Sequence, residues 1–117
     1  MSDVDRLAVF GDIHGNADAL EAVIAAVRAA GITRALCTGD VVLRGLQPEQ
    51  CISAIRDTGW PCVQGNTDRR VANKKVKTQT DMRDMRPGTR TWTKAVLSDQ
   101  AIEDRKSTRL NSSHVKR

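Results

Sequence analysis

Residues 6–16, RLAVFGDIHGN, join a short apolar run to a polar turn that contains two glycines. The run Arg6–Phe10 predicts a buried strand, because it ends at Gly11-Asp12, where the chain can turn sharply. From Ala17 to Ala30 apolar side chains recur at helical spacing, and Gly31 is a typical helix stop. This stretch therefore predicts a strand–loop–helix unit.

The same plan continues along the chain. A strand is expected at Ala35–Thr38, a helix from Pro48 to about Thr58, and a third strand at Cys62–Gln64. A further helix is expected at Thr91–Glu103. Strands joined by helical crossovers predict an α/β fold with a parallel sheet and helices on its faces.

Length and composition set the class of protein. With 117 residues, 39% of them hydrophobic, the chain is the size of one domain or part of one. It has no apolar run of the roughly 18 residues that a membrane span needs, and its N-terminus does not resemble a signal peptide. Cys37, Cys51 and Cys62 cannot all pair within one chain, so reduced cysteines and a cytoplasmic location are expected.

The charge is unevenly distributed. The net charge is +5, yet residues 1–68 carry 5 basic and 9 acidic side chains, whereas residues 105–117 carry 5 basic and no acidic ones. We expect residues 105–117 to be a disordered, non-native basic tail similar to translated adapter sequence, and residues 1–104 to form the domain. With one Phe and no Tyr, the chain has few residues for base stacking, which argues against nucleic-acid binding.

Each expected strand ends in glycine followed by a side chain that can bind metal: Gly11-Asp12, Gly39-Asp40 and Gly65-Asn66. The carboxyl ends of parallel strands share one edge of a sheet, so Asp12, His14, Asp40 and Asn66 should converge. Two carboxylates, an imidazole and an amide oxygen suit Mn, Fe, Zn or Ni better than a calcium cage.

The motifs GDIHGN, GDVVLRG and GNTD, in this order, resemble those of the calcineurin-like metallophosphoesterases. The resemblance covers roughly residues 6–104. It implies the N-terminal half of an α/β/β/α sandwich with parallel strands and helical crossovers. It also implies a hydrolase that cleaves phosphoric esters or anhydrides through a hydroxide held by two divalent metal ions.

The resemblance assigns a role to each motif residue. Asp12 and His14 would bind the first metal, Asp40 would bridge both metals, and Asn66 would bind the second. Arg44 aligns with an arginine that contacts phosphate in the protein phosphatases of this superfamily, a task that its forked guanidinium suits. Residues 39–51 also resemble a bacterial branch that shares Gly45, Pro48 and Cys51, and in that branch Arg44 has no fixed role and would be a surface charge.

Some positions depart from the family pattern. Leu43 stands where protein phosphatases have aspartate, and Thr67 stands where many members have a histidine. Asp68 is retained, either as a catalytic group or as a brace for the loop. The family's later histidine motifs are missing, because His14 and His114 are the two histidines of the chain. We therefore expect an N-terminal fragment with weak or no activity.

Several functional alternatives stay open at this point. The substrate could be a phosphorylated small molecule, a nucleotide or a phosphoprotein. A degenerate, metal-free fold that acts as a binding module is the first alternative to an enzyme. A basic nucleic-acid-binding protein is the second. Bound metal would separate the enzyme from the binding module.

Overall fold

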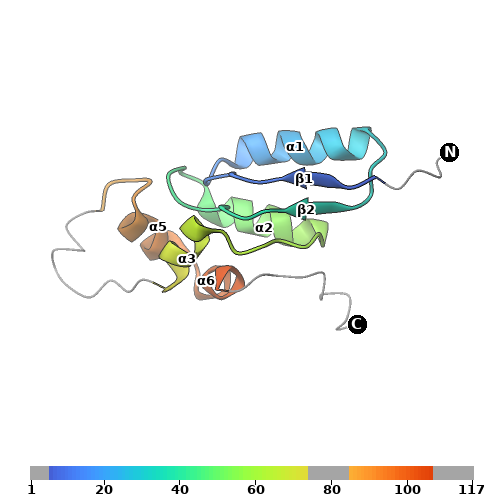
Figure 1. Ribbon diagram of the computed structural model, residues 1–117. Coiled ribbons are helices and arrows are strands. Elements are labelled where there is room, and N and C mark those ends of the chain that lie inside the picture. The colour runs from blue at the N-terminus through green and yellow to red at the C-terminus, as the bar shows by residue number, and fades with distance from the viewer. Residues whose placement is uncertain (1–5, 74–84, 107–117) are drawn as a thin grey trace.

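The computed structural model describes residues 6–73 and 85–106 (Figure 1). These residues include two short parallel strands, β1 (Ala8–Phe10) and β2 (Ala35–Cys37). Their residues pair in register along the whole ladder: Ala8 with Ala35, Val9 with Leu36, and Phe10 with Cys37. The α/β class with parallel strands and a helical crossover is therefore confirmed.

Helices α1 (Ala17–Ala29) and α2 (Pro48–Thr58) lie where the sequence predicts them and pack against each other. The side chain of Asn16 caps α1 by accepting the N–H of Ala19 at 3.0 Å. Gly59 ends α2 in the left-handed conformation, with φ of 74°. Both helices bury their apolar faces in one core, which also holds strand residues: Leu20, Ile24, Val27, Ala35, Cys37, Cys51, Ile52 and Ile55.

The predicted third strand, Cys62–Gln64, is wrong in its extent. Cys62 forms a single parallel bridge to Cys37, flanked by hydrogen bonds from the Cys37 N–H to Pro61 and from the Val63 N–H to Cys37. The ladder stops there because the chain turns at residue 65 and enters a helix that the sequence did not indicate, α3 (Asn66–Asn73).

The single helix predicted at Thr91–Glu103 is also wrong. The structure has two helices, α5 (Arg90–Val96) and α6 (Asp99–Arg105), with a break at Ser98. The Ser98 hydroxyl caps the first turn of α6, while its own N–H and Oγ donate to the Glu49 carboxylate at 3.0 and 2.9 Å. These side-chain bonds satisfy the backbone that a continuous helix would have used.

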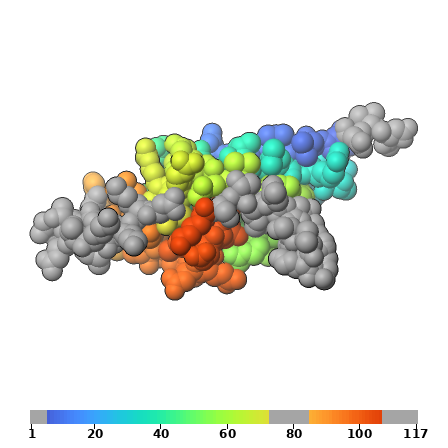
Figure 2. Space-filling model, turned by 60° about the horizontal axis from the view of Figure 1, so that its bottom comes forward, coloured from blue at the N-terminus to red at the C-terminus, as the bar shows by residue number. Residues whose placement is uncertain are grey.

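Helices α3, α5 and α6 form a second group beside α2. Figure 2 shows α3 and α6 on one face of the molecule, and α6 contacts both α3 and α2. The boundary expected after Asp104 falls inside α6, which runs through Arg105, a side chain only 1% exposed. Residues 107–117 lie outside the described residues, so the origin of the basic tail stays a prediction.

The two faces of the sheet differ. Ala8 and Phe10 pack against the core, whereas Val9, between them, is 59% exposed. Leu7 and Val63 are exposed as well. None of the helices in the described parts of the chain is long and apolar enough to cross a membrane.

Candidate metal centre

Two loops at the carboxyl ends of β1 and β2 are joined by backbone hydrogen bonds. The N–H of His14 donates to the Asp40 carbonyl at 2.9 Å, and the N–H of Gly15 donates to the Val41 carbonyl at 2.8 Å. The Gly15 carbonyl accepts the N–H of Gln47 at 2.9 Å. The loops therefore hold each other in place, and this fixes the backbone positions from which their side chains extend.

The backbone of these loops is strained. Every non-glycine residue with positive φ in the described part of the chain lies in one of them: Asp12 (56°), His14 (48°), Asp40 (56°), Leu43 (89°) and Arg44 (83°). This region is costly for L-residues, and such strain persists only where the surroundings hold it. The strained residues include three of the four metal ligands expected from the sequence.

Asp12, His14 and Asp40 converge on one point. One ligand atom from each lies within 4.8 Å of the others. The Nδ1 atom of His14 is buried and has no hydrogen-bond partner. A buried polar atom without a partner is costly, and a metal ion would satisfy it. Two carboxylates and an imidazole therefore fit a divalent transition metal ion.

Asp40 is held as a carboxylate. Its Oδ1 accepts both the N–H and the hydroxyl of Thr67, each at 3.0 Å. Burial pushes the pKa of Asp40 up, but the two bonds from Thr67, a side-chain bond with Asp12 and the charge of His14 outweigh it, so the pKa is lowered. An ionised Asp40 is the form that binds metal.

Asn66 is exposed at the first position of α3. Its two neighbours both touch Asp40: Thr67 through the bonds above, and Gly65 so closely that a β-carbon there would overlap the Asp40 carboxylate. The structure thus brings the backbone of the GNTD motif to the Asp12, His14 and Asp40 cluster. A metal-ligand role for the Asn66 amide stays a prediction.

Asp68 is completely buried. Its Oδ2 accepts the N–H groups of Asp40 and Gly65 at 2.9 and 3.0 Å, and its Oδ1 accepts those of Val41 and Val42 at 2.8 and 3.2 Å. One carboxylate thereby joins the loop after β2 to the loop before α3. Both of its oxygens accept hydrogen bonds and it has no exposed surface, as expected for a brace between the loops, and a catalytic role for Asp68 stays a prediction.

The positive partner of Asp68 is Arg105, a residue that the sequence did not point to. Its Nη1 lies 2.9 Å from Asp68 Oδ2, and both side chains are at most 1% exposed. The sequence around Arg105 indicates a buried side chain only weakly, because Arg105 begins a run of basic and polar residues. Its position one helical turn after the buried Ala101 was the available clue.

Arg44 lies apart from this brace. Its side chain is exposed, and its N–H donates to the Gly88 carbonyl at 2.9 Å, which ties the backbone of the loop to the segment before α5. Gly88 approaches so closely that a β-carbon would meet the Arg44 carbonyl oxygen. These contacts fix the backbone of Arg44, and contact of its exposed guanidinium with a phosphate stays a prediction.

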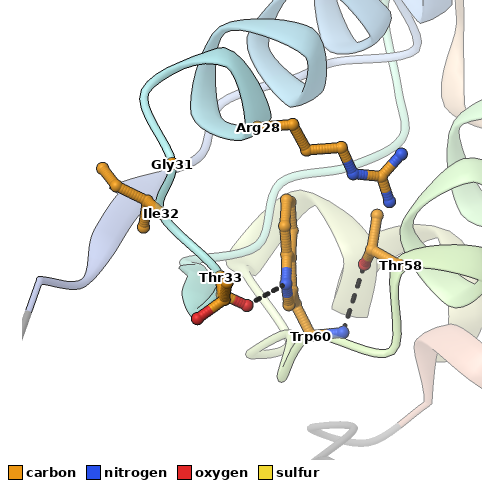
Figure 3. Close-up of a pocket in the computed structure, with 6 residues that line it drawn as sticks. All are labelled: Arg28, Gly31, Ile32, Thr33, Thr58 and Trp60. Carbon is orange, nitrogen blue, oxygen red and sulfur yellow. Dashed lines mark hydrogen bonds between the residues drawn. The ribbon is translucent and has the colours of Figure 1, made fainter.

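A pocket of about 340 Å³ lies elsewhere, at the carboxyl end of α1 (Figure 3). Arg28 lies across the ring of Trp60, with 5.8 Å from its guanidinium carbon to the ring centre. The indole Nε1 donates to the Thr33 carbonyl at 3.3 Å. The candidate metal ligands Asp12, His14 and Asp40 follow the opposite ends of the strands, so this pocket is separate from them.

A family model described as "Calcineurin-like phosphoesterase superfamily domain" matches residues 6–113. An uncharacterized protein of Methanocaldococcus jannaschii is 41% identical over 68 residues, which cover 58% of this chain and 28% of that protein.

A solved structure has the same fold. The crystal structure of a metallophosphoesterase from Sphaerobacter thermophilus matches with a TM-score of 0.69 and 24% identity, over 86% of this chain and 39% of that one. The chain therefore spans less than half the length of either protein.

Proposed function

Since this chain belongs to the calcineurin-like phosphoesterase superfamily, we propose that it carries part of the active site of a metal-dependent hydrolase of phosphoric esters or anhydrides. The observation that carries the proposal is the convergence of Asp12, His14 and Asp40, together with the buried, unpartnered Nδ1 of His14. A solvated turn would leave these groups apart and hydrated.

The proposed ligands divide between two ions. Asp12 and His14 would hold the first ion, Asp40 would serve as a ligand to both, and Asn66 would hold the second. When bound, the ions supply Lewis-acid activation of water and of the phosphoryl group. The chain's own residues fix the geometry: Thr67 orients the Asp40 carboxylate, and Asp68 holds the two loops together.

Arg44 is the proposed contact for the phosphoryl group of the substrate. It is exposed on the loop that follows Asp40, and its guanidinium can donate two parallel hydrogen bonds to phosphate oxygens. The substrate class proposed is a phosphorylated small molecule, a nucleotide or a phosphoprotein.

Aromatic packing argues against the nucleic-acid alternative. The rings of Phe10 and Trp60 meet edge to face with 6.1 Å between their centres, and Trp60 is 8% exposed. Stacking on bases requires exposed aromatic faces. Of the aromatic residues in the described part of the chain, these two are engaged in the core.

The test compares metal binding and hydrolysis for the 117-residue chain. Mn²⁺ binding is measured by electron paramagnetic resonance, and hydrolysis is measured with p-nitrophenyl phosphate, ATP and a phosphopeptide. We expect Mn²⁺ binding that His14→Ala abolishes. Hydrolysis should be weak in this chain and stronger in a longer protein that carries the family's later histidine motifs. An absence of Mn²⁺ binding at millimolar concentration would favour the metal-free binding module instead.

A further inference from the structure

Cys37 and Cys62 form a pair of buried thiols that the proposed metal centre does not use. They are the two partners of the parallel bridge between β2 and the segment that follows α2, and neither side chain is exposed. Both are free thiols, and their sulfur atoms are close enough to share a hydrogen bond. Two thiols in contact are the starting point for a disulfide.

The backbone holds the two cysteines at a separation that a disulfide can span. Paired residues on neighbouring strands lie about 4.8 Å apart, and disulfides join Cα atoms that are about 4.4–6.8 Å apart. Hydrogen bonds from the Cys37 N–H to Pro61 and from the Val63 N–H to Cys37 fix this register. The β-carbons must approach to about 3.8 Å, which is closer than the strands themselves lie, so the disulfide would be strained and easily reduced.

We propose that Cys37 and Cys62 form a reversible disulfide on oxidation by hydrogen peroxide, and that this bond weakens metal binding at Asp40. The effect on metal binding rests on the proposed function, whereas formation of the disulfide does not depend on it. In a reducing compartment such a disulfide is a transient, redox-sensing state, and the two thiols are the resting state.

The chemistry consumes one hydrogen peroxide and releases two waters. The Cys37 sulfur attacks one peroxide oxygen, the O–O bond breaks, and a sulfenic acid and a water form. The Cys62 sulfur then attacks the Cys37 sulfur, the S–O bond breaks, and the hydroxyl leaves as water with the proton of Cys62. The two thiols lose two electrons to the peroxide. Cys37 suits the first step, because its hydrogen bond with Cys62 lowers the pKa of its thiol and outweighs the effect of burial.

A small oxidant can reach the pair through a local opening. In the described part of the chain, the segment that follows α2 pairs with β2 through a single bridge at Cys62. The next residue, Val63, is already 37% exposed. A segment with so few ladder bonds separates from the sheet at a lower cost in free energy than global unfolding.

The backbone between the thiols and the metal centre is too closely packed to absorb a shift. Three residues after the two cysteines the chain reaches Asp40 and Gly65, and a β-carbon on Gly65 would overlap the Asp40 carboxylate. A β-carbon on Gly39 would likewise overlap the Val63 carbonyl oxygen. A disulfide that draws the two strands together must therefore move these touching segments. The Asp40 carboxylate then leaves its place in the ligand cluster.

The first test detects the disulfide in the wild type. Trypsin places the three cysteines on separate peptides: residues 35–44 (Cys37), 45–56 (Cys51) and 57–69 (Cys62). After hydrogen peroxide, blocking of free thiols and digestion of the monomer band, mass spectrometry should find peptide 35–44 joined to peptide 57–69 with the loss of two hydrogens. Prior reduction should separate them. Links through Cys51, sulfinic acid without a link, or three unmodified thiols would each overturn the proposal.

Three alanine variants show which sulfurs are needed. Cys37→Ala and Cys62→Ala each remove one member of the pair, and peroxide should leave both without an internal cross-link. Cys51→Ala is the matched control, because it makes the same change at a buried cysteine of α2 that lies outside the bridge. It should form the cross-link as the wild type does.

The second test measures the Mn²⁺ dissociation constant of the wild type before and after oxidation, with the peroxide removed before metal is added. The constant should rise roughly 10-fold, as when a residue that orients a metal ligand is replaced, and reduction followed by gel filtration should restore it. Peroxide treatment of Cys37→Ala should leave its constant unchanged.

The two parts of the proposal fail in different ways. An unchanged Mn²⁺ dissociation constant in the fully cross-linked protein would overturn the effect on metal binding. A reduced wild type that does not bind Mn²⁺ would instead contradict the proposed function, while the joined peptides would still establish the disulfide between Cys37 and Cys62.

Discussion

Thr67 donates two hydrogen bonds to a single oxygen of Asp40. Its N–H and its hydroxyl each lie 3.0 Å from Asp40 Oδ1. Thr67 is buried at the second position of α3, so the bond direction is fixed by the helix and not by a flexible side chain. The residue that replaces the family's usual histidine thus orients the proposed bridging ligand.

Replacing Thr67 by valine keeps the shape and removes the hydroxyl. Thr67→Val should lower the free energy of unfolding by about 1.5 kcal/mol at neutral pH, as expected for a hydrogen bond to a charged group. The lowered pKa of Asp40 means that this carboxylate adds stability above its ordinary pKa of 3.8, and that the gain is lost as pH falls through the folded value. Urea denaturation should therefore show the two proteins converging in acid. Thr67→Ser should behave as the wild type, and a Thr67→Val deficit that does not shrink as the pH falls below 3.8 would contradict the role.

Asp40→Asn should remove most Mn²⁺ binding. The substitution takes one negative charge from the proposed position between both ions while keeping the size of the side chain. We expect the Mn²⁺ affinity to fall by more than ~100-fold. That figure is the upper end of the loss seen when a residue that only orients a metal ligand is replaced. Asp57→Asn, on the exposed face of α2, is the control with the same chemical change. Unchanged Mn²⁺ stoichiometry in Asp40→Asn would count against the bridging role.

Asp68→Asn separates a loop brace from a group that acts on the substrate. The substitution breaks the buried ion pair with Arg105, which keeps Asp104 as its other carboxylate partner, so the free energy of unfolding should fall by about 3 kcal/mol. Asp99→Asn, exposed at the start of α6, should change stability by less than about 1 kcal/mol. Urea denaturation monitored by circular dichroism measures both. A stable Asp68→Asn with normal Mn²⁺ binding but no hydrolysis would indicate a catalytic role in place of the brace.

The first half of the fold was predictable because its signals are local. Gly31 as the stop after one helix and Pro48 at the start of the next each act within a turn of the chain, and both are confirmed. The convergence of Asp12, His14 and Asp40 followed from one topological rule about parallel strands.

The second half was not predictable because its signals are tertiary. The break at Ser98 depends on the carboxylate of Glu49, which lies 49 residues earlier in the sequence. The burial of Arg105 depends on Asp68, a partner on another helix. No periodicity in the segment itself indicates a bond of this kind, so one long helix was the natural but wrong expectation.

The contact between Gly45 and His14 predicts a second way to disturb the centre. A β-carbon at position 45 would collide with the His14 carbonyl oxygen and with the backbone of Gly15. Because backbone cannot yield as a side chain can, Gly45→Ala should force the two loops apart and lower both stability and Mn²⁺ affinity.

Gly31→Ala is the control for this prediction. Gly31 has φ of 76°, and a β-carbon there would meet only the end of Arg6, at 3.7 Å. Gly31→Ala should lower the free energy of unfolding by about 1 kcal/mol, because alanine is strained in the left-handed backbone conformation. Its Mn²⁺ affinity should be unchanged. Equal Mn²⁺ affinity in Gly45→Ala and Gly31→Ala would show that the contact does not constrain the centre.

The buried thiol of Cys51 predicts how stability depends on alkaline pH. Burial, and next the charge of Glu21, raise the pKa of Cys51 from 9.0 to about 12. Below pH 9 the thiol is protonated in both the folded and the unfolded chain, so it does not affect the equilibrium. Above pH 9 the unfolded chain releases this proton and the folded chain does not, so stability falls as pH rises, by up to about 1.4 kcal/mol per pH unit.

Cys51→Ala should be less stable than the wild type at pH 7, because it leaves a cavity, yet it should lose less stability between pH 8 and pH 10. Parallel stability curves for the two proteins over that range, measured by urea denaturation, would show that Cys51 does not ionise on unfolding.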